Sequence, residues 1–221
     1  LRRTVSELWV ASGILEQRYR KAGPVFRIGP EPARFPLPRE RPPSATDKVR
    51  IFYHGQKTHL PERRWLRDVV AVVHETMEQC SFEIVGGAET QRWYRHLERV
   101  RVRPLALWPD YLQRSTQERF DIGLAPLVPT PFNAARSWVK YLDIARFGAV
   151  GIFADCVPYD EVVRDGNNGL LCSRDDPDAW IRVLTDLIRD TSRRNRLIAQ
   201  VDWPSSSPVP PVLSSMLEAQ A

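Results

Sequence analysis

Residues 120–172 constrain the fold of this chain more than any other segment. In one uninterrupted series they contain an apolar strand pattern, a loop rich in proline and asparagine, a helical pattern, a second apolar strand and a turn of glycine and asparagine. Such a series is half of an α/β domain of the kind that binds nucleotides. Because ligands of open parallel sheets lie beyond the carboxyl ends of the strands, we expect a site in the loop at residues 128–137.

Strand and helix patterns alternate through most of the chain, starting at Val49. The expected strands are VRIFYH (residues 49–54), FEIVGG (82–87), RVRPLAL (101–107), DIGLAPL (121–127), VGIFA (150–154) and GLLC (169–172). The expected helices cover residues 62–79, 89–98, a segment opening at Pro109, 137–147, 159–164 and 177–190. This alternation predicts an α/β fold with a Rossmann-like parallel sheet of about six strands, helices on both faces and right-handed crossovers.

Composition divides the chain into three parts. Residues 1–48 begin with a short strand and a helix capped by Ser12, and they end in a linker rich in proline and arginine. Residues 49–200 are expected to form one α/β domain, because 221 residues suffice for one sizeable core but not for two. Residues 201–221 are a C-terminal tail with one short helix. Because the first residue is Leu1 rather than Met, we expect a fragment, or a protein whose first part is missing.

The charge balance raises the question of an anionic partner. The net charge is +5 and the pI is about 9.4, mainly because of arginine. A phosphate-bearing ligand, nucleic acid and acidic lipid all fit this charge. The basic and aromatic residues between positions 92 and 103 could suggest nucleic acid, but no recognised nucleic-acid module accompanies them. We therefore predict that the chain binds no nucleic acid.

Several classes of protein are disfavoured by what the sequence lacks. No apolar run approaches the roughly 20 residues needed to cross a bilayer. The three cysteines, Cys80, Cys156 and Cys172, show no Cys-x-x-Cys spacing and leave an odd count, which argues against a disulfide framework. The histidines do not cluster, so no metal site or cofactor is predicted. These observations favour a soluble, cytoplasmic protein, with attachment to the inner face of the membrane as a further possibility.

Polar side chains follow the ends of the first two strands. Gly55, Gln56, Lys57 and His59 come after the first strand; glycine lets a ligand approach the backbone, lysine can meet a phosphate, and histidine can donate to a sugar or phosphate oxygen. The alternative is an exposed loop with incidental polar residues. Gly86 ends the second strand, where two glycines are more often a tight turn than a ligand site. No Gly-x-Gly-x-x-Gly follows, so a dinucleotide enzyme is disfavoured.

The loop after the fourth strand carries the strongest candidate site. Asn133, Arg136 and Ser137 precede a predicted helix N-terminus, whose free N–H groups suit a diphosphate. Lys140 and Asp143 follow three residues apart on nearly one face of that helix. The carboxylate can accept hydrogen bonds from ribose hydroxyls while Lys140 or Arg136 neutralises phosphate. The alternative is a capping serine followed by a solvated lysine–aspartate pair.

These motifs resemble a known family. Residues 49–199 are similar to the C-terminal, donor-binding domain of GT-B glycosyltransferases, specifically the large retaining group related to family 4. The matching segments, in the family's order and spacing, are DIGLAPL, PFNAARSWVKYLDIARFGAVGIFAD, VPYDEVVRDGNNGLL and DPDAWIRVLTDLI. The first 35 residues are similar to the segment that ends the family's N-terminal domain and enters the interdomain linker.

The resemblance implies a glycosyltransferase half that binds a nucleotide-diphosphate sugar as donor substrate and passes the sugar to a glycan, lipid or protein acceptor. It implies retention of configuration, no metal, a bacterial type of cell-surface glycan synthesis, and a missing N-terminal domain or a membrane surface as partner. The family carries a glutamate for the sugar and, after seven residues, a second glutamate for the ribose; Ala135 and Asp143 stand there. Gln56 replaces the usual diphosphate arginine, for which Lys57, Arg63 or Arg64 could substitute. The family's catalytic group usually lies in the N-terminal domain, so no catalytic residue is assigned.

Two other functions remain open. Ala135, Gln56 and the missing domain favour a non-catalytic or truncated remnant that binds a nucleotide sugar without transferring it. A nucleotide-sugar epimerase with the same fold is weaker, because the carboxylates and histidines for that chemistry are not evident.

Overall fold

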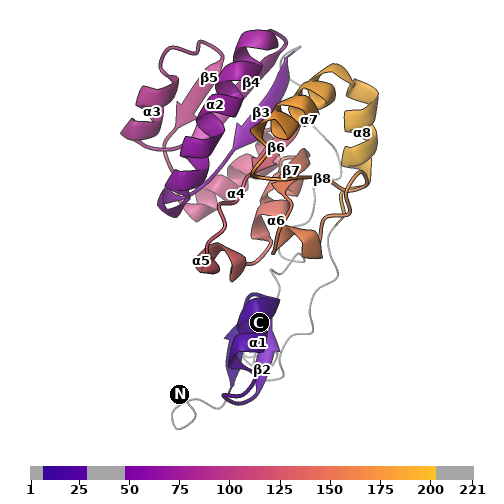
Figure 1. Ribbon diagram of the computed structural model, residues 1–221. Coiled ribbons are helices and arrows are strands. Elements are labelled where there is room, and N and C mark those ends of the chain that lie inside the picture. Colours follow the sequence, from indigo (N-terminus) through magenta and orange to yellow (C-terminus); the bar gives the residue numbers. More distant parts are fainter. Residues whose placement is uncertain (1–6, 29–47, 203–221) are drawn as a thin grey trace.

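A computed structural model describes residues 7–28 and 48–202, and all structural statements below concern these residues. Its centre is a six-stranded, all-parallel sheet in the order β5-β4-β3-β6-β7-β8 (Figure 1). The strands are β3 (Val49–Tyr53), β4 (Cys80–Val85), β5 (Val100–Arg103), β6 (Ile122–Ala125), β7 (Val150–Ala154) and β8 (Leu170–Cys172).

The chain enters this sheet in the middle and fills it in two directions. It runs outward from β3 to β5, and then returns to place β6 on the other side of β3. Only Ile51↔Ile122 and Phe52↔Gly123 are paired between these two central strands. β6 and β7 are buried along their whole length, as expected for strands covered on both faces. The strands after β3 are added on one side of it and the strands from β6 onward on the other, and this change of side creates the switch point at which such sheets bind ligands.

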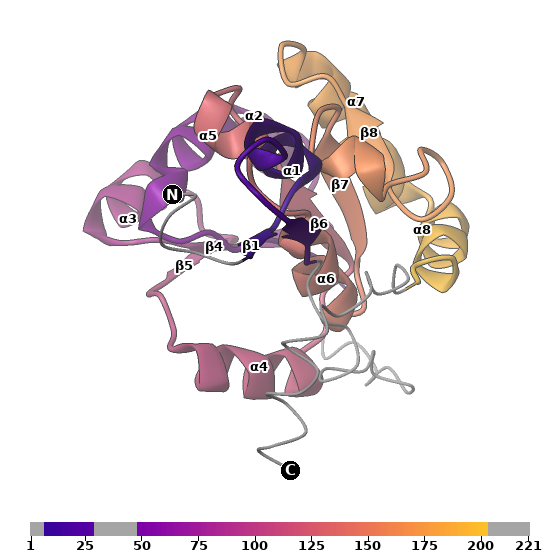
Figure 2. The same cartoon turned by 90° about the horizontal axis from the view of Figure 1, so that it is seen from below.

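Helices cover both faces of the sheet (Figure 2). On one face α2 packs against α7, where Trp65 and Trp180 meet edge to face with ring centroids 5.2 Å apart. On the other face lie α4 and α6. The helices are α2 (Leu60–Thr76), α3 (Ala88–Tyr94), α4 (Trp108–Gln117), α5 (Pro131–Ala134), α6 (Val139–Arg146), α7 (Pro177–Arg189) and α8 (Thr191–Ala199), with 3-10 turns η1 (Lys57–His59) and η2 (Tyr159–Glu161).

A small N-terminal unit contacts the domain near the carboxyl ends of its strands. It consists of β1 (Leu8–Val10), α1 (Gly13–Tyr19) and β2 (Val25–Arg27), with the two strands parallel. Ser12 caps α1 by accepting a hydrogen bond from the backbone N–H of Leu15, and its hydroxyl donates to the carbonyl of Ala135 at 2.8 Å. Arg27 forms an ion pair with Glu161. The unit is therefore attached to the loops that follow β6 and β7.

The predicted α/β fold, with six parallel strands and helices on both faces, is confirmed. The third predicted strand ends at Arg103, because Pro104 has no N–H to continue the ladder. The helix predicted to start at Ser137 starts at Val139, and Trp138 at its N-cap makes no side-chain capping hydrogen bond. The short helix predicted at 159–164 is the 3-10 turn η2.

Four elements were not predicted from the sequence: β2, η1, α5 and α8. The predicted proline-rich linker and the short helix of the C-terminal tail lie outside the described residues. The division of the chain at residues 48 and 200 stays a prediction.

Gly123→Ala is expected to destabilise the fold. A Cβ at this position of β6 would lie 2.5 Å from Cγ1 and 2.7 Å from Cγ2 of Ile144, a buried residue of α6. Since a branched, buried side chain cannot move aside cheaply, we expect a loss of about 1–3 kcal/mol in the free energy of unfolding, measured by urea denaturation. Gly87→Ala is the control, because its Cβ would meet nothing within 4 Å and only a helix N-cap changes. Equal losses in the two variants would contradict this account of the packing.

Candidate nucleotide-sugar site

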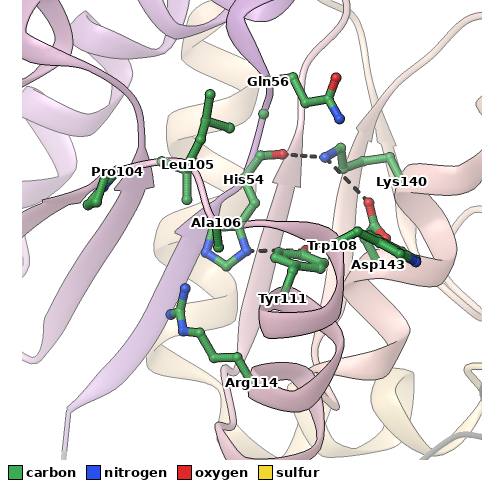
Figure 3. A pocket seen from close by; sticks show the side chains of 12 residues that line it. His54, Gln56, Pro104, Leu105, Ala106, Trp108, Tyr111, Arg114, Lys140 and Asp143 are labelled. Atoms are coloured by element: carbon green, nitrogen blue, oxygen red, sulfur yellow. Dashed lines mark hydrogen bonds and ion pairs between the residues drawn. The ribbon is translucent and has the colours of Figure 1, made fainter.

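Seven of the ten predicted site residues line two adjoining hollows at the carboxyl ends of the strands, near the switch point between β3 and β6. The first has a volume of about 130 Å³ and is lined by apolar Val85, Leu105 and Trp108 together with His54, Tyr111 and Arg114 (Figure 3). The second has a volume of about 260 Å³ and lies on the side of the loop after β6. Three residues line both hollows: Gln56, Lys140 and Asp143.

Helix α6 supplies the shared wall. Lys140 Nζ lies 3.6 Å from the Oδ2 atom of Asp143, one turn along the helix, and donates a hydrogen bond to the carbonyl of His54. Figure 3 shows both interactions at the end of β3. Arg146 contacts the other carboxylate oxygen at 3.3 Å. Burial lowers the pKa of Lys140, and the neighbouring Asp143 opposes that shift. The predicted lysine–aspartate pair is therefore largely buried rather than solvated.

The second hollow is cationic on the side of Arg136. This guanidinium donates from Nη1 to His59 Nε2 at 2.7 Å and from Nη2 to Thr58 Oγ1 at 3.2 Å. It also lies 5.0 Å from the ring centroid of Phe132. Ser137 lines the same hollow. Arg136, His59 and Ser137 thus line this hollow together with Lys140.

Asn133 has a different environment from the other predicted site residues. Its amide donates to Glu62 Oε1 at 2.9 Å and to the carbonyl of Val128 at 2.8 Å, and it is 8% exposed. It lines neither hollow. These bonds tie the loop after β6 to α2, so Asn133 shapes the loop that carries Arg136.

The loop after β3 depends on a glycine. A Cβ on Gly55 would lie 2.8 Å from the hydroxyl of Tyr53. The buried Arg63 donates to the carbonyls of Gly55 and Gln56 at 3.2 and 2.9 Å, so it holds this loop and is not free for a diphosphate. The side chain of Lys57 lies outside the described part of the chain.

Gly86 and Arg64 lie away from both hollows. A Cβ on Gly86 would approach Thr90 Oγ1 to 2.4 Å, which explains the glycine by packing against α3. Arg64 is exposed on α2 and faces Glu89 and Trp93. We did not predict from the sequence that Trp108, Tyr111 and Arg114 of α4 line the first hollow. Aromatic residues in the first turn of a helix that follows a strand could have indicated them.

A buried charged network supports the first hollow from below. Glu83 on β4 contacts His54 Nε2 at 3.1 Å, accepts from Arg103 Nε at 2.7 Å and is hydrogen-bonded by Arg114. Burial alone would raise the pKa of Glu83, but the hydrogen bonds from His54 and Arg114 outweigh it and set the value at about 2. Burial lowers the pKa of His54, whose Nδ1 lies 3.3 Å from the hydroxyl of Tyr111.

Comparison with known families decides what kind of protein carries this site. The profile of the family described as "Glycosyl transferases group 1" matches residues 48–190, well over half of the chain. The chain belongs to this family. A comparison with curated protein sequences finds no match.

Solved structures share the fold of this group 1 chain at low sequence identity. A mutant of S. aureus TarM in complex with fondaparinux, alpha-GlcNAc-glycerol and UDP has a TM-score of 0.69 at 10% identity, over 90% of this chain and 40% of that chain. Anabaena Alr3699/HepE in complex with UDP and glucose has 0.67 at 15%, over 90% and 58%. Sucrose-phosphate synthase (tll1590) from Thermosynechococcus elongatus has 0.61 at 18%, over 97% and 58%. The chain thus spans about half the length of the solved structures that it matches.

Two further findings concern the described residues of this group 1 chain. In residues 7–28 and 48–202, no three histidine, cysteine, aspartate or glutamate side chains gather as a metal site would require. Within the same ranges, no helix is both long and apolar enough to cross a membrane.

The stability of this group 1 chain should decrease in acid through Glu83. The carboxyl titrates near 4.5 when unfolded and at about 2 in the fold, so its contribution is complete above 4.5 and is lost as the pH falls toward 2. We expect a loss of about 3 kcal/mol in the free energy of unfolding over this window, measured by urea denaturation at several pH values.

The matched variants are Glu83→Gln and Glu89→Gln. Glu83→Gln should flatten the acid dependence and, because it leaves Arg103 and Arg114 without their carboxylate, lower stability at neutral pH by about 3–5 kcal/mol. Glu89→Gln removes a partly exposed carboxylate and should change stability by at most about 1 kcal/mol. An unchanged acid slope in Glu83→Gln would contradict the assigned role.

Proposed function

We propose that this chain is the donor-binding half of a glycosyltransferase, which takes a nucleotide-diphosphate sugar and passes the sugar to a glycan, lipid or protein acceptor. One observation carries the proposal: a hollow with aromatic and apolar walls adjoins a cationic hollow, and both share Gln56, Lys140 and Asp143. A nucleotide sugar matches this order, because its aromatic base is followed by a ribose, two negatively charged phosphates and a sugar. UDP in TarM and HepE supports this choice of ligand.

In this proposal the base lies in the first hollow. Trp108 and Tyr111 stack on each other with ring centroids 5.8 Å apart, and with Leu105 they give an apolar wall suited to a flat ring. Asp143 then stands between the two hollows, where its carboxylate can accept hydrogen bonds from the ribose hydroxyls. Aspartate is one methylene shorter than the family's glutamate, but Asp143 lines both hollows and so stands next to the proposed ribose.

The diphosphate lies in the second hollow, where Arg136 and Lys140 carry positive charge. When the bond between the sugar and the diphosphate breaks, the electron pair stays on the phosphate oxygen and negative charge grows there. Cations fixed in advance next to that oxygen stabilise the charge and lower the barrier. In this proposal Arg136 and Lys140 stabilise the charge of the diphosphate in place of a metal and of the family's usual arginine, where this chain has Gln56. Retention of configuration is the stereochemistry proposed from the family resemblance.

The donor sugar does not have the contact that the family's glutamate would make, because Ala135 stands at that position. Asn133 is occupied by Glu62 and Val128, so the polar groups left for sugar hydroxyls are those of Ser137 and Gln56 and the backbone. The acceptor site and the catalytic group are assigned to an N-terminal half supplied in addition to these residues. The process proposed for the complete enzyme is cell-surface glycan synthesis at the cytoplasmic side of a membrane.

Ala135 also favours a second function, binding of a nucleotide sugar without transfer. The two functions differ in turnover. Release of UDP from UDP-glucose, of GDP from GDP-mannose or of TDP from TDP-glucose in the presence of a complementing N-terminal half would establish transfer, whereas binding without release in all three cases would establish the non-catalytic function.

Asp143→Ala is expected to weaken UDP binding. A lost hydrogen bond to a charged carboxylate costs about 1.5–3 kcal/mol, which corresponds to a rise of at least about tenfold in Kd, measured by isothermal titration calorimetry. Asp175→Ala is the matched control, because this exposed aspartate pairs only with its neighbour Arg174 among the described residues. No heat with UDP, GDP or TDP, or equal Kd values for the three chains, would overturn the donor site.

A further inference from the structure

Glu62 is a buried carboxylate that the donor site as described does not use. It lies in the first turn of α2 and is 1% exposed. Its Oε1 atom accepts from Asn133 Nδ2 at 2.9 Å and from the N–H of Val128 at 3.2 Å, which fixes the loop after β6. Its Oε2 atom lies 3.7 Å from His59 Nδ1 and has no hydrogen-bond partner within the described residues.

The ring of His59 lies between this carboxylate and Arg136. Arg136 Nη1 lies 2.7 Å from Nε2 of the ring and 3.3 Å from Nδ1. The carboxylate of Glu62 lies on the side of Nδ1 and can only accept, so we assign the proton of the neutral ring to Nδ1. This assignment leaves Nε2, the ring nitrogen closer to Arg136, without a proton. Burial lowers the pKa of His59, the nearby carboxylate of Glu62 opposes this shift, and Lys140 and Arg136 add to it, so the ring is neutral at pH 7.

Neutral groups hold the guanidinium of Arg136 in the described structure. They are the ring of His59, the hydroxyl of Thr58 at 3.2 Å and the ring of Phe132 at 5.0 Å. A cation held in this way keeps its charge for an anionic ligand, whereas an ion pair with a carboxylate would compete with that ligand.

We propose that Glu62 and His59 are positioning residues that aim the guanidinium of Arg136 at the phosphates of a nucleoside diphosphate in the second hollow. The inference rests on the proposed donor site. Glu62 acts through both of its oxygens, since Oε2 orients the ring that holds the side chain of Arg136, and Oε1 holds the loop that carries its backbone. Neither residue needs to touch the ligand.

The arrangement makes ligand binding sensitive to acid. Protonation of His59 removes the acceptor at Nε2 and places an imidazolium beside Arg136 from the loop and Lys140 from α6, with only Glu62 from α2 in compensation. Arg136 then leaves its position. Since UDP also gains a proton near pH 6, the relevant quantity is the excess acid sensitivity of the natural chain over that of Arg136→Ala.

A double-mutant cycle on the full chain tests the inference, with UDP as the probe in calorimetry. His59→Ala and Arg136→Ala should each raise Kd about tenfold, and the double variant should bind no more weakly than Arg136→Ala. His59→Gln, whose amide oxygen can accept from Arg136, should stay within about threefold of the natural chain. His96→Ala, on the exposed surface after α3, should leave Kd unchanged.

Additive losses of about a hundredfold in the double variant would mean that His59 contacts UDP itself, and would overturn the inference. So would a His59→Ala chain that binds UDP as tightly as the natural one, or an acid sensitivity equal to that of Arg136→Ala.

A second measurement needs no ligand and separates this inference from the donor site. Nitrogen-15 NMR of the free chain should show His59 protonated at Nδ1, and Arg136→Ala should raise the pKa of the ring because a neighbouring cation is gone. A ring protonated at Nε2 would overturn the positioning role even if UDP binds. A chain that binds no UDP while showing the Nδ1 proton would overturn the donor site alone.

Discussion

β3 and β6 lie side by side at the centre of the sheet, although two complete strand–helix units separate them in the chain. Because the chain continues from β3 to β4 on one side and from β6 to β7 on the other, the loops after β3 and β6 leave the same edge of the sheet in different directions. The second hollow lies between these loops, and the first adjoins it between the end of β3, the segment after β5 and helices α4 and α6. Lys140 spans the gap between the loops, since its ammonium reaches from α6 to the carbonyl of His54 at the end of β3. The site therefore exists only because the sheet is filled in two directions.

Buried charge is the second constraint on this edge. Glu83, next to the first hollow, accepts hydrogen bonds from Arg103 and Arg114, and Glu62, next to the second, accepts from Asn133 and from the N–H of Val128 through one of its oxygens. An isolated charge in either place would destabilise the fold. Both carboxylates instead hold loops and side chains from neighbouring elements in one arrangement, which is how a site built from separate loops becomes rigid before a ligand arrives.

Local pattern predicts much of this architecture because it depends on spacing within single elements. Lys140 and Asp143 share a helix face simply because they are three residues apart, and glycine at position 55 follows from the end of a strand. The hydrogen bond from Asn133 to Glu62 could not be predicted, because it depends on the approach of α2 to the loop after β6, which local sequence does not reveal. The start of α6 was also misplaced, because Ser137 looks like a cap in sequence while the bonds of the preceding turn hold it outside the helix.

The bond from Ser12 to the carbonyl of Ala135 has a mechanical consequence. That carbonyl and the N–H of Arg136 belong to one rigid peptide plane, and the N–H is itself bonded to the carbonyl of Asn133 at 3.2 Å. The N-terminal unit is thus hydrogen-bonded to the peptide group that links Ala135 to Arg136. A displacement of the N-terminal unit would therefore act on the same peptide plane to which the side chain of Arg136 is attached.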